Sequence, residues 1–232
     1  MSSADFAVII TAAGSSSRMG TGVKKEYLPL GTGTVLSSSV QIFSDTGLFS
    51  TILITIPAGG ESAAKEALCS LDKTLLDTLL FTAGGASRQE SVLQGLEALA
   101  ASGFPKTGVV LIHDGARPWV SPEIIQSVAE TAAQKGATVP CIPPVDTLKE
   151  IAPDGTIVRH LRRDILAAVQ TPQGFHFGKL LEAHRAAQRS SSEDGAVYTD
   201  DTEIWDRYEG AVYCCPGSPE NKKITYRDDI DR

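Results

Sequence analysis

No stretch of this sequence approaches the roughly 18 consecutive apolar residues that span a bilayer. Its first residues, MSSADFAVII, also lack the basic start of a secretory signal. Basic residues are not in excess, because the formal net charge is -7. Proteins that bind nucleic acids or membrane surfaces usually present a basic face to those polyanions. The sequence therefore predicts a cytoplasmic protein that binds neither nucleic acid nor membrane.

Cysteine and histidine are scarce, with four of each. Cys69, Cys141, Cys214 and Cys215 form neither a zinc-ligand spacing nor a CxxC redox motif, and we interpret them as buried thiols. The histidines also lack metal-ligand spacing, which argues against a built-in zinc centre. The 232 residues, 42% of them hydrophobic, fit one domain with a substantial core, and we treat residues 1–232 as that domain.

Apolar, β-branched runs alternate with helical patterns along most of the chain. The segment Ser87–Ser102 has one apolar helical face and begins with a capping box formed by Ser87 and Glu90. Ser121 caps a second helix. Strands that alternate with helices predict an α/β fold, with a mostly parallel sheet and helices on both faces. The predicted strands are Phe6–Ile10, Thr51–Ile56, Leu79–Thr82, Val109–Ile112 and Ala137–Ile142.

The alternation breaks at residues 139–172. Two runs of alternating polar and apolar residues flank Asp154-Gly155, which is a turn signal between hairpin strands. We expect a β-arm that leaves the sheet. Because an isolated hairpin is marginally stable in water, the arm should pack on a partner, and a second subunit is the natural candidate. After the arm, the sequence predicts helices at His176–Arg189 and around Thr202–Tyr208, and strands at Ala211–Cys215 and Lys222–Thr225.

The segment after the first strand, TAAGSSSRMGTGVKKEYLPL, combines small residues with basic ones. Ligands of parallel sheets bind at the carboxyl ends of the strands. The spacing fits neither a Walker A loop nor the G-x-G-x-x-G pattern of dinucleotide folds. The backbone of such a loop can surround a triphosphate, with Arg18 as a bidentate donor and Lys25 as a point charge. A solvated loop with incidental basic residues is the alternative.

The full pattern resembles the 2-C-methyl-D-erythritol 4-phosphate cytidylyltransferase family of sugar-phosphate nucleotidyltransferases. The resemblance begins with Ala12-Ala13-Gly14, Arg18-Met19, Lys25 and Tyr27-Leu28 and spans nearly the whole chain. Further matches, in chain order, are GGASRQESV, HDGARP, PVDTLK, TPQ, TDD and GSPENKKIT. Thr11 and Gly115 depart from residues common in the family, and we expect little effect. The resemblance implies a three-layer Rossmann-like nucleotidyltransferase fold with a mostly parallel twisted sheet and a protruding β-arm.

The reaction that the resemblance implies joins CTP to methylerythritol phosphate and releases pyrophosphate, in the non-mevalonate isoprenoid pathway. A phosphate monoester carries about -1.5 to -2 charge at neutral pH, so its attack needs no strong general base. Cations must bring the two anions together. Resemblance and chemistry together assign this role to Arg18, Lys25 and Lys223, with Mg²⁺ bridging phosphate oxygens. Lys222 is the weaker candidate, because alternation along a short strand points it to the opposite face.

The resemblance also implies further site residues. Asp114 ends an apolar strand, where it reaches the metal or the second substrate, or caps the following turn. Arg117, in the same loop, is assigned a structural role. Backbone groups of small residues would read cytosine, although each small residue is also explained by packing. The CTP-binding candidates besides Asp114 are Ala12, Ala13, Gly14, Gly85 and Ser91.

Residues of the arm correspond to family positions that grip the acceptor. The resemblance implies that Thr147 and Arg163 reach a neighbouring subunit's site, and counting back from TPQ selects Arg163 over Arg162. We also assign Thr171 to the acceptor phosphate. The resemblance thus implies a homodimer in which the arm completes each site, whereas Asp146 orients the arm or stabilises a turn. A cytidylyltransferase acting on ribitol 5-phosphate and a noncatalytic nucleotide-binding protein are the rival interpretations.

Overall fold

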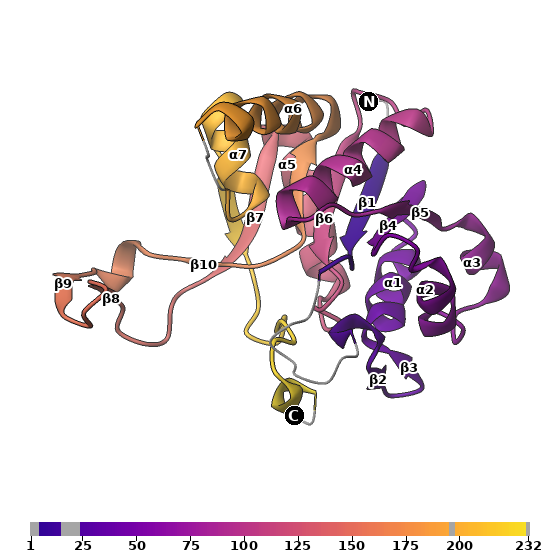
Figure 1. Cartoon of the computed structure of the whole chain (residues 1–232), viewed down its shortest axis with the longest axis horizontal. Helices are drawn as coiled ribbons and strands as arrows, with labels where there is room; N and C mark the ends of the chain where they lie inside the picture. The colour runs from indigo at the N-terminus through magenta and orange to yellow at the C-terminus, as the bar shows by residue number, and fades with distance from the viewer. Residues whose placement is uncertain (1–4, 15–23, 195–197, 231–232) are drawn as a thin grey trace.

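A mostly parallel sheet lies at the centre of the molecule (Figure 1). The computed structural model describes residues 5–14, 24–194 and 198–230. The strands follow the order β10-β7-β11-β6-β1-β4-β5, and β12 pairs with β7. Only β10 and β11 run antiparallel to their neighbours among the described strands of this sheet. The strands are β1 (Phe6–Thr11), β4 (Thr51–Ile56), β5 (Leu80–Ala83), β6 (Val109–Asp114), β7 (Ala137–Ile142), β10 (Ala168–Val169), β11 (Gln173–His176) and β12 (Tyr213–Pro216).

Helices cover both faces of the sheet, because successive residues of a strand point to opposite sides. Val8 and Ile10 of β1 pack in the cluster that holds α1, α2 and α5, whereas Ala7 and Ile9 pack with α4, α6 and α7. In Figure 1, α4 and α6 cross the upper part of the molecule, and α1 and α2 lie at the lower right. The predicted three-layer architecture and its five strands are confirmed. The helices are α1 (Val35–Asp45), α2 (Glu61–Ala67), α3 (Lys73–Thr78), α4 (Arg88–Ala101), α5 (Pro122–Lys135), α6 (Phe177–Asp194) and α7 (Asp201–Tyr208).

Side-chain caps fix where the helices begin. The Ser87 hydroxyl accepts a hydrogen bond from the Glu90 amide at 3.1 Å, as predicted for the start of α4. The second half of the predicted capping box is wrong, because the Glu90 carboxylate accepts from the Ala86 amide instead, at 2.8 Å. Ser121 caps α5 through the Ile124 amide. Helix α6 continues beyond the predicted end at Arg189 and reaches Asp194.

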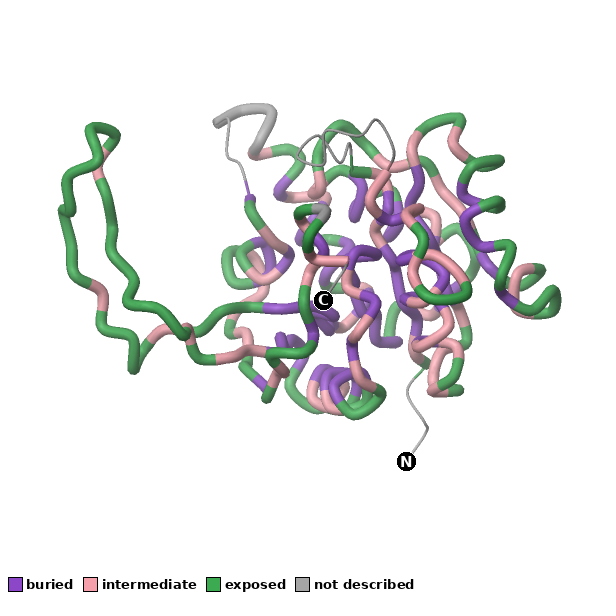
Figure 2. Tube along the Cα trace, turned by 90° about the horizontal axis from the view of Figure 1, so that it is seen from below, coloured by how far each residue is buried: buried purple, intermediate pink, exposed green. Residues whose placement is uncertain are grey.

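The β-arm leaves the sheet after Ile142 and returns at Ala168, so the predicted limits, 139 and 172, include residues of the sheet itself. Its hairpin is formed by β8 (Lys149–Ile151) and β9 (Ile157–His160), followed by the 3-10 turn η3 (Arg163–Ile165). The predicted turn is confirmed, since Gly155 has a φ of 86° and Asp154 Oδ1 accepts from the Thr156 amide. The arm extends far from the body and is mostly exposed (Figures 1 and 2).

The remaining short elements frame the edge of the sheet. They are η2 (Lys25–Tyr27), the hairpin of β2 (Pro29–Leu30) and β3 (Gly33–Thr34), and η4 (Arg227–Asp229). The predicted strand Lys222–Thr225 is wrong, because this extended segment bonds to a loop: the Ile224 amide donates to the Ala116 carbonyl at 2.8 Å. Across the described ranges, no helix is long and apolar enough to cross a membrane.

Candidate active site

A pocket of about 680 Å³ opens at the carboxyl edge of the sheet, within the range of roughly 300–1,000 Å³ that is typical of small-molecule sites. Strands β1, β4, β5 and β6 are parallel, so the loops that follow them meet there. Thr11 and Asp114, the last residues of β1 and β6, are paired neighbours in the sheet. The pocket lining comes from these loops, from η2 and from the C-terminal segment: Thr11, Ala13, Gly14, Lys24, Lys25, Glu26, Pro57, Gly85, Ala86, Ser87, Arg88, Ser91, Asp114, Ala116, Lys223 and Thr225.

Three lysines converge on the pocket from two distant parts of the chain. Lys25 Nζ donates to the Ile224 carbonyl at 3.0 Å, which ties η2 to the C-terminal segment. Lys24 Nζ donates to the Gly14 carbonyl and lies 3.9 Å from Glu26 Oε2. Burial lowers the pKa of Lys24, and Glu26 partly offsets this effect. Lys223 Nζ donates to Asp114 Oδ2 at 2.6 Å.

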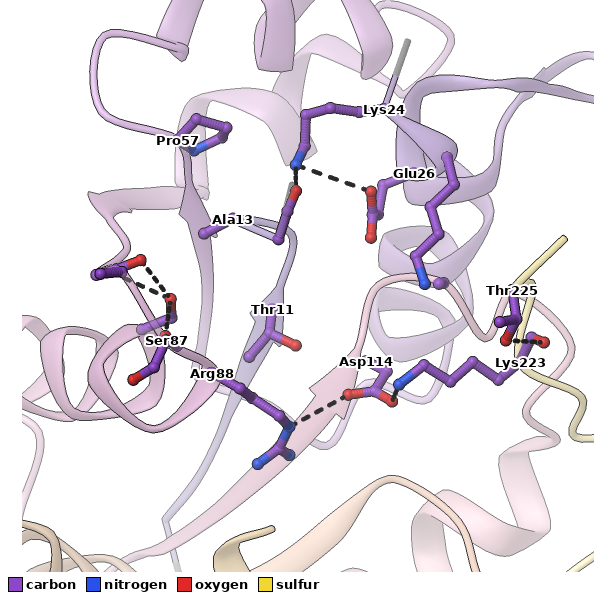
Figure 3. Close-up of a pocket in the computed structure, with 16 residues that line it drawn as sticks. Thr11, Ala13, Lys24, Glu26, Pro57, Ser87, Arg88, Asp114, Lys223 and Thr225 are labelled. Carbon is purple, nitrogen blue, oxygen red and sulfur yellow. Dashed lines mark hydrogen bonds and ion pairs between the residues drawn. The ribbon is translucent and has the colours of Figure 1, made fainter. Parts of the chain in front are cut away.

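Two buried carboxylates, Glu26 and Asp114, line the pocket, and Asp114 is the one surrounded by cations. Figure 3 shows Arg88 and Lys223 pointing at it from opposite sides. Arg88 Nε lies 3.7 Å from Oδ1, and Arg117 Nε lies 3.9 Å from Oδ2. Burial alone would raise the pKa of Asp114, but Lys223 and Arg88 outweigh burial and hold this pKa well below its usual range. Asp114 is therefore ionised at neutral pH.

Behind Asp114, a neutral histidine supports the loop. His113 is fully buried, and burial lowers its pKa to about 4. Its Nε2 lies 3.2 Å from the Arg117 carbonyl, and its Nδ1 lies 3.1 Å from the Thr171 hydroxyl. The Arg117 carbonyl can only accept, so the proton of the neutral ring is on Nε2, which donates to it. Nδ1 is then an acceptor for the Thr171 hydroxyl, which itself accepts from the Asp114 amide at 3.1 Å. His113 and Thr171 thus fix the backbone of Asp114.

A second part of the pocket, here called the glycine end, is formed by the loop of Gly84 and Gly85 together with Ala13, Gly14 and Ser91. A Cβ atom added to Gly84 would lie 2.3 Å from Ala13 Cβ and 2.7 Å from Ser91 Oγ. A Cβ atom on Gly85 would lie 2.3 Å from Glu90 Cβ. The Ser91 hydroxyl accepts from the Gly85 amide at 3.1 Å and donates to the Ser87 carbonyl at 2.8 Å. Neighbouring side chains thus fill the space that a side chain on either glycine would take, and they pack directly against the backbone of this loop.

The structure brings most of the predicted site residues together. Ala13, Gly14, Gly85 and Ser91 line the glycine end of the pocket, and Lys25, Asp114 and Lys223 line it as well. Ala12 does not line the pocket, because its side chain packs in the core and its amide donates to the Thr55 carbonyl. Thr171 is buried behind Asp114 rather than in the lining. Arg18 lies outside the described residues.

The two predicted acceptor residues of the arm lie away from this pocket. Thr147 is exposed, and Arg163 Nη1 donates to the Val145 carbonyl at 2.7 Å. Neither residue lines the pocket of its own chain.

Sequence reasoning assigned no role to Lys24, Glu26 or Arg88, which all line the pocket. For Arg88 a signal was present. It is the first residue of α4, where the helix dipole disfavours a cation, so an arginine at that position calls for a compensating acid. That acid is Asp201, 2.7 Å from Arg88 Nη2. For Lys24 the only signal was its position beside Lys25.

The family model described as 2-C-methyl-D-erythritol 4-phosphate cytidylyltransferase matches residues 6–232. A relative of that name from Pelotomaculum thermopropionicum is 35% identical over 225 residues, which cover 97% of this chain and 90% of the relative. A "Bifunctional enzyme IspD/IspF" from Desulforudis audaxviator is 37% identical over 98% of this chain, which spans only 55% of that longer protein.

A solved structure gives the same answer. The crystal structure of 2-C-methyl-D-erythritol 4-phosphate cytidylyltransferase from Thermus thermophilus superposes with a TM-score of 0.76. It is 32% identical in sequence, and the match covers 98% of this chain and 96% of that one. With a family model and relatives that match almost end to end, this chain belongs to the 2-C-methyl-D-erythritol 4-phosphate cytidylyltransferase family.

Proposed function

We propose that this protein transfers the cytidylyl group of CTP to 2-C-methyl-D-erythritol 4-phosphate in the non-mevalonate isoprenoid pathway. A phosphate oxygen of the acceptor attacks the α-phosphorus of CTP, and the bond from this phosphorus to the bridging oxygen breaks. The products are 4-diphosphocytidyl-2-C-methyl-D-erythritol and pyrophosphate. One observation carries the proposal: Lys24, Lys25 and Lys223 reach a single pocket at the sheet edge of a protein whose formal net charge is -7.

Charge is the main obstacle to this reaction. The acceptor phosphate is close to a dianion at neutral pH and must approach a triphosphate. Fixed cations lower this barrier most where charge builds up in the transition state, and losing one such group typically costs about 100- to 1,000-fold in kcat. Lys25 and Lys223 supply two of these cations, and Arg18 of the loop supplies a third. Because the acceptor is already deprotonated, the pocket requires no general base.

The glycine end of the pocket binds the cytosine. Ala13, Gly14 and Gly85 expose backbone groups, and the Ser91 hydroxyl holds the Gly85 amide in place. Cytosine presents both an amino donor and acceptors, which backbone groups can satisfy. Ala12 contributes through its backbone, whose amide donates to the Thr55 carbonyl, rather than through its side chain.

Mg²⁺ fits the chemistry of Asp114. Magnesium is usually held by one or two carboxylates together with substrate phosphates, rather than by a complete protein cage. Consistent with this pattern, no group of three or more metal-ligating side chains occurs in the described parts of the chain, and Asp114 is ionised and lines the pocket. Asp114 would hold the ion beside the CTP phosphates. When bound, the ion supplies positive charge to the phosphate oxygens.

The arm joins two copies of the chain into a homodimer. Val145 and Ile165 are 83% and 72% exposed on an arm whose hairpin pairs only with itself among the described strands. Apolar side chains displayed in this way favour burial against a partner. In the dimer, Thr147 and Arg163 reach the acceptor phosphate in the partner subunit's pocket.

The test is pyrophosphate release from CTP and Mg²⁺ with methylerythritol phosphate or ribitol 5-phosphate as acceptor. We expect turnover with methylerythritol phosphate and an at least 100-fold loss in Lys25→Ala, since that change removes a cation from the phosphates. Lys65→Ala, at an exposed site on α2, is the matched control and should keep wild-type activity. If only ribitol 5-phosphate is turned over, ribitol 5-phosphate and not methylerythritol phosphate is the acceptor. If neither compound gives product, the protein binds nucleotide without catalysing the transfer.

A further inference from the structure

A line of charged side chains runs from the pocket into the interior behind α4. Lys223 contacts Asp114, whose other carboxylate oxygen faces Arg88 at 3.7 Å. Arg88 Nη2 donates to Asp201 Oδ2 at 2.7 Å, and Asp201 Oδ1 lies 3.1 Å from His184 Nε2. Asp201 and His184 are both fully buried, and neither belongs to the pocket lining. The line therefore connects two buried groups outside the pocket lining to a carboxylate within it.

Asp201 cannot easily release Arg88. Burial raises the pKa of Asp201, but the Arg88 guanidinium and His184 outweigh burial and lower it, so the buried carboxylate is ionised. An ionised carboxylate that loses its partner in the interior is strongly destabilising. Arg88 also stays charged beside these carboxylates, because Asp201 and Asp114 raise its pKa despite burial. This ion pair holds the guanidinium in one position.

His184 completes the support from α6. Its Nδ1 is buried and has no hydrogen-bond partner among the described residues, so its one bond is to Asp201. Asp201 is the first residue of α7, and Arg88 is the first residue of α4. Three helices thus fix the guanidinium whose Nε faces Asp114.

Lys223 and Arg88 differ in what they can do for Asp114. The Lys223 side chain is 36% exposed and lines the pocket, so a bound phosphate competes with Asp114 for its ammonium group. When Lys223 turns to a phosphate, Asp114 loses its closest partner. Arg88 remains, because Asp201 holds it from behind. The orientation of the Asp114 carboxylate in the loaded pocket then depends on Arg88 at Oδ1 and on Arg117, whose Nε lies 3.9 Å from Oδ2.

From this geometry we infer that Asp201 and His184 are positioning residues for cytidylyl transfer: they fix Arg88, and Arg88 fixes Asp114. The inference rests on the proposed function. A purely structural role, joining α4 to α6 and α7, would make the same contacts. The experiment must therefore separate positioning from helix packing.

The chain offers a matched control for helix packing. Glu97 of α4 pairs with Arg185 of α6 at 2.6 Å and is not part of the pocket lining. We expect Asp201→Asn to lower kcat roughly 10- to 100-fold, the usual effect of losing a residue that orients a site carboxylate. KM for CTP should stay within about threefold, because no group that touches CTP is removed. Glu97→Gln should keep kcat within about twofold.

A second readout does not need turnover. The side-chain Nε–H signal of Arg88 in NMR spectra, assigned by its loss in Arg88→Lys, should be sharp and protected in the wild type. It should broaden in Asp201→Asn and stay unchanged in Glu97→Gln. If Asp201→Asn does not fold, His184→Gln is the substitute variant, because it keeps the Arg88–Asp201 pair. We expect His184→Gln to lower kcat about 3- to 10-fold.

The outcomes separate the two proposals. A wild-type protein that makes no CDP product overturns the proposed function, while the Arg88 signal still tests positioning. An unchanged Arg88 signal and kcat in Asp201→Asn overturn the positioning inference. Equal losses of kcat in Asp201→Asn and Glu97→Gln also overturn it, because they assign the effect to helix packing.

Discussion

The glycine end of the pocket allows a quantitative test through Gly84→Ala. The added Cβ would lie 2.3 Å from Ala13 Cβ, whereas ordinary van der Waals contact begins near 3.4 Å. Ala13 and Gly84 must therefore move apart by at least about 1 Å. Both belong to loops at the glycine end of the pocket, so relief of this clash displaces the wall against which we place cytosine.

Two effects of different size follow from that displacement. Overpacking costs about 1–3 kcal/mol of folding stability, which lowers Tm by roughly 2–12 °C in a chain of this length. A displacement of about 1 Å at a binding site costs up to about 100-fold in catalysis. We expect KM for CTP to rise roughly 10- to 100-fold, measured by pyrophosphate release at saturating acceptor, with a smaller change in kcat.

Gly174→Ala is the control for overpacking alone. Its Cβ would lie 2.8 Å from Val128 Cγ1 and 3.0 Å from Ala132 Cβ, between β11 and α5 and outside the pocket lining. Thermal unfolding should show a lower Tm for both variants, and only Gly84→Ala should lose CTP affinity. Wild-type CTP affinity in Gly84→Ala, or an equal loss in both variants, would refute the placement of cytosine.

Two further predictions concern His113 and the arm. The folded-state pKa of His113, about 4, is below its ordinary value of 6.5. As the pH falls, His113 therefore binds its proton in the unfolded chain at a higher pH than in the folded protein. This contribution to stability is present above pH 6.5 and is lost as pH falls toward 4, by up to about 3 kcal/mol. Urea unfolding should show that loss, and His113→Asn should flatten the slope between these pH values. The double variant Val145→Asp/Ile165→Asp should sediment as a monomer and lose turnover, because it charges the apolar arm; an active monomer would contradict the shared site.

The strands of the sheet and the location of the pocket could be predicted from the sequence, because both follow from the pattern of apolar and small residues along short segments. Apolar, β-branched runs identified five strands, and the rule that ligands bind at the carboxyl ends of parallel strands indicated the edge where Thr11 and Asp114 lie side by side. Ala12 illustrates the limit of this reasoning. It lies in the same motif as Ala13, yet its side chain enters the core on the same side as Val8 and Ile10, whereas Ala13 lines the pocket.

Long-range contacts explain the remaining differences. Lys222–Thr225 has the composition of a strand, but the Ile224 amide bonds to a loop carbonyl, and its own carbonyl accepts from Lys25. Lys223 still faces the pocket and Lys222 is exposed, as expected, although no strand sets the alternation. The Asp201–Arg88 pair joins residues 113 positions apart, which no local pattern reveals.

These neighbouring lysines provide the most direct test of the central claim, that cations gathered at one pocket let two anions react. Lys222→Ala and Lys223→Ala remove the same charge from adjacent positions, one outside the pocket lining and one within it. In pyrophosphate release from CTP and methylerythritol phosphate, we expect kcat/KM to fall at least 100-fold in Lys223→Ala and to stay within about threefold of wild type in Lys222→Ala. Equal activity of the two variants would contradict the account.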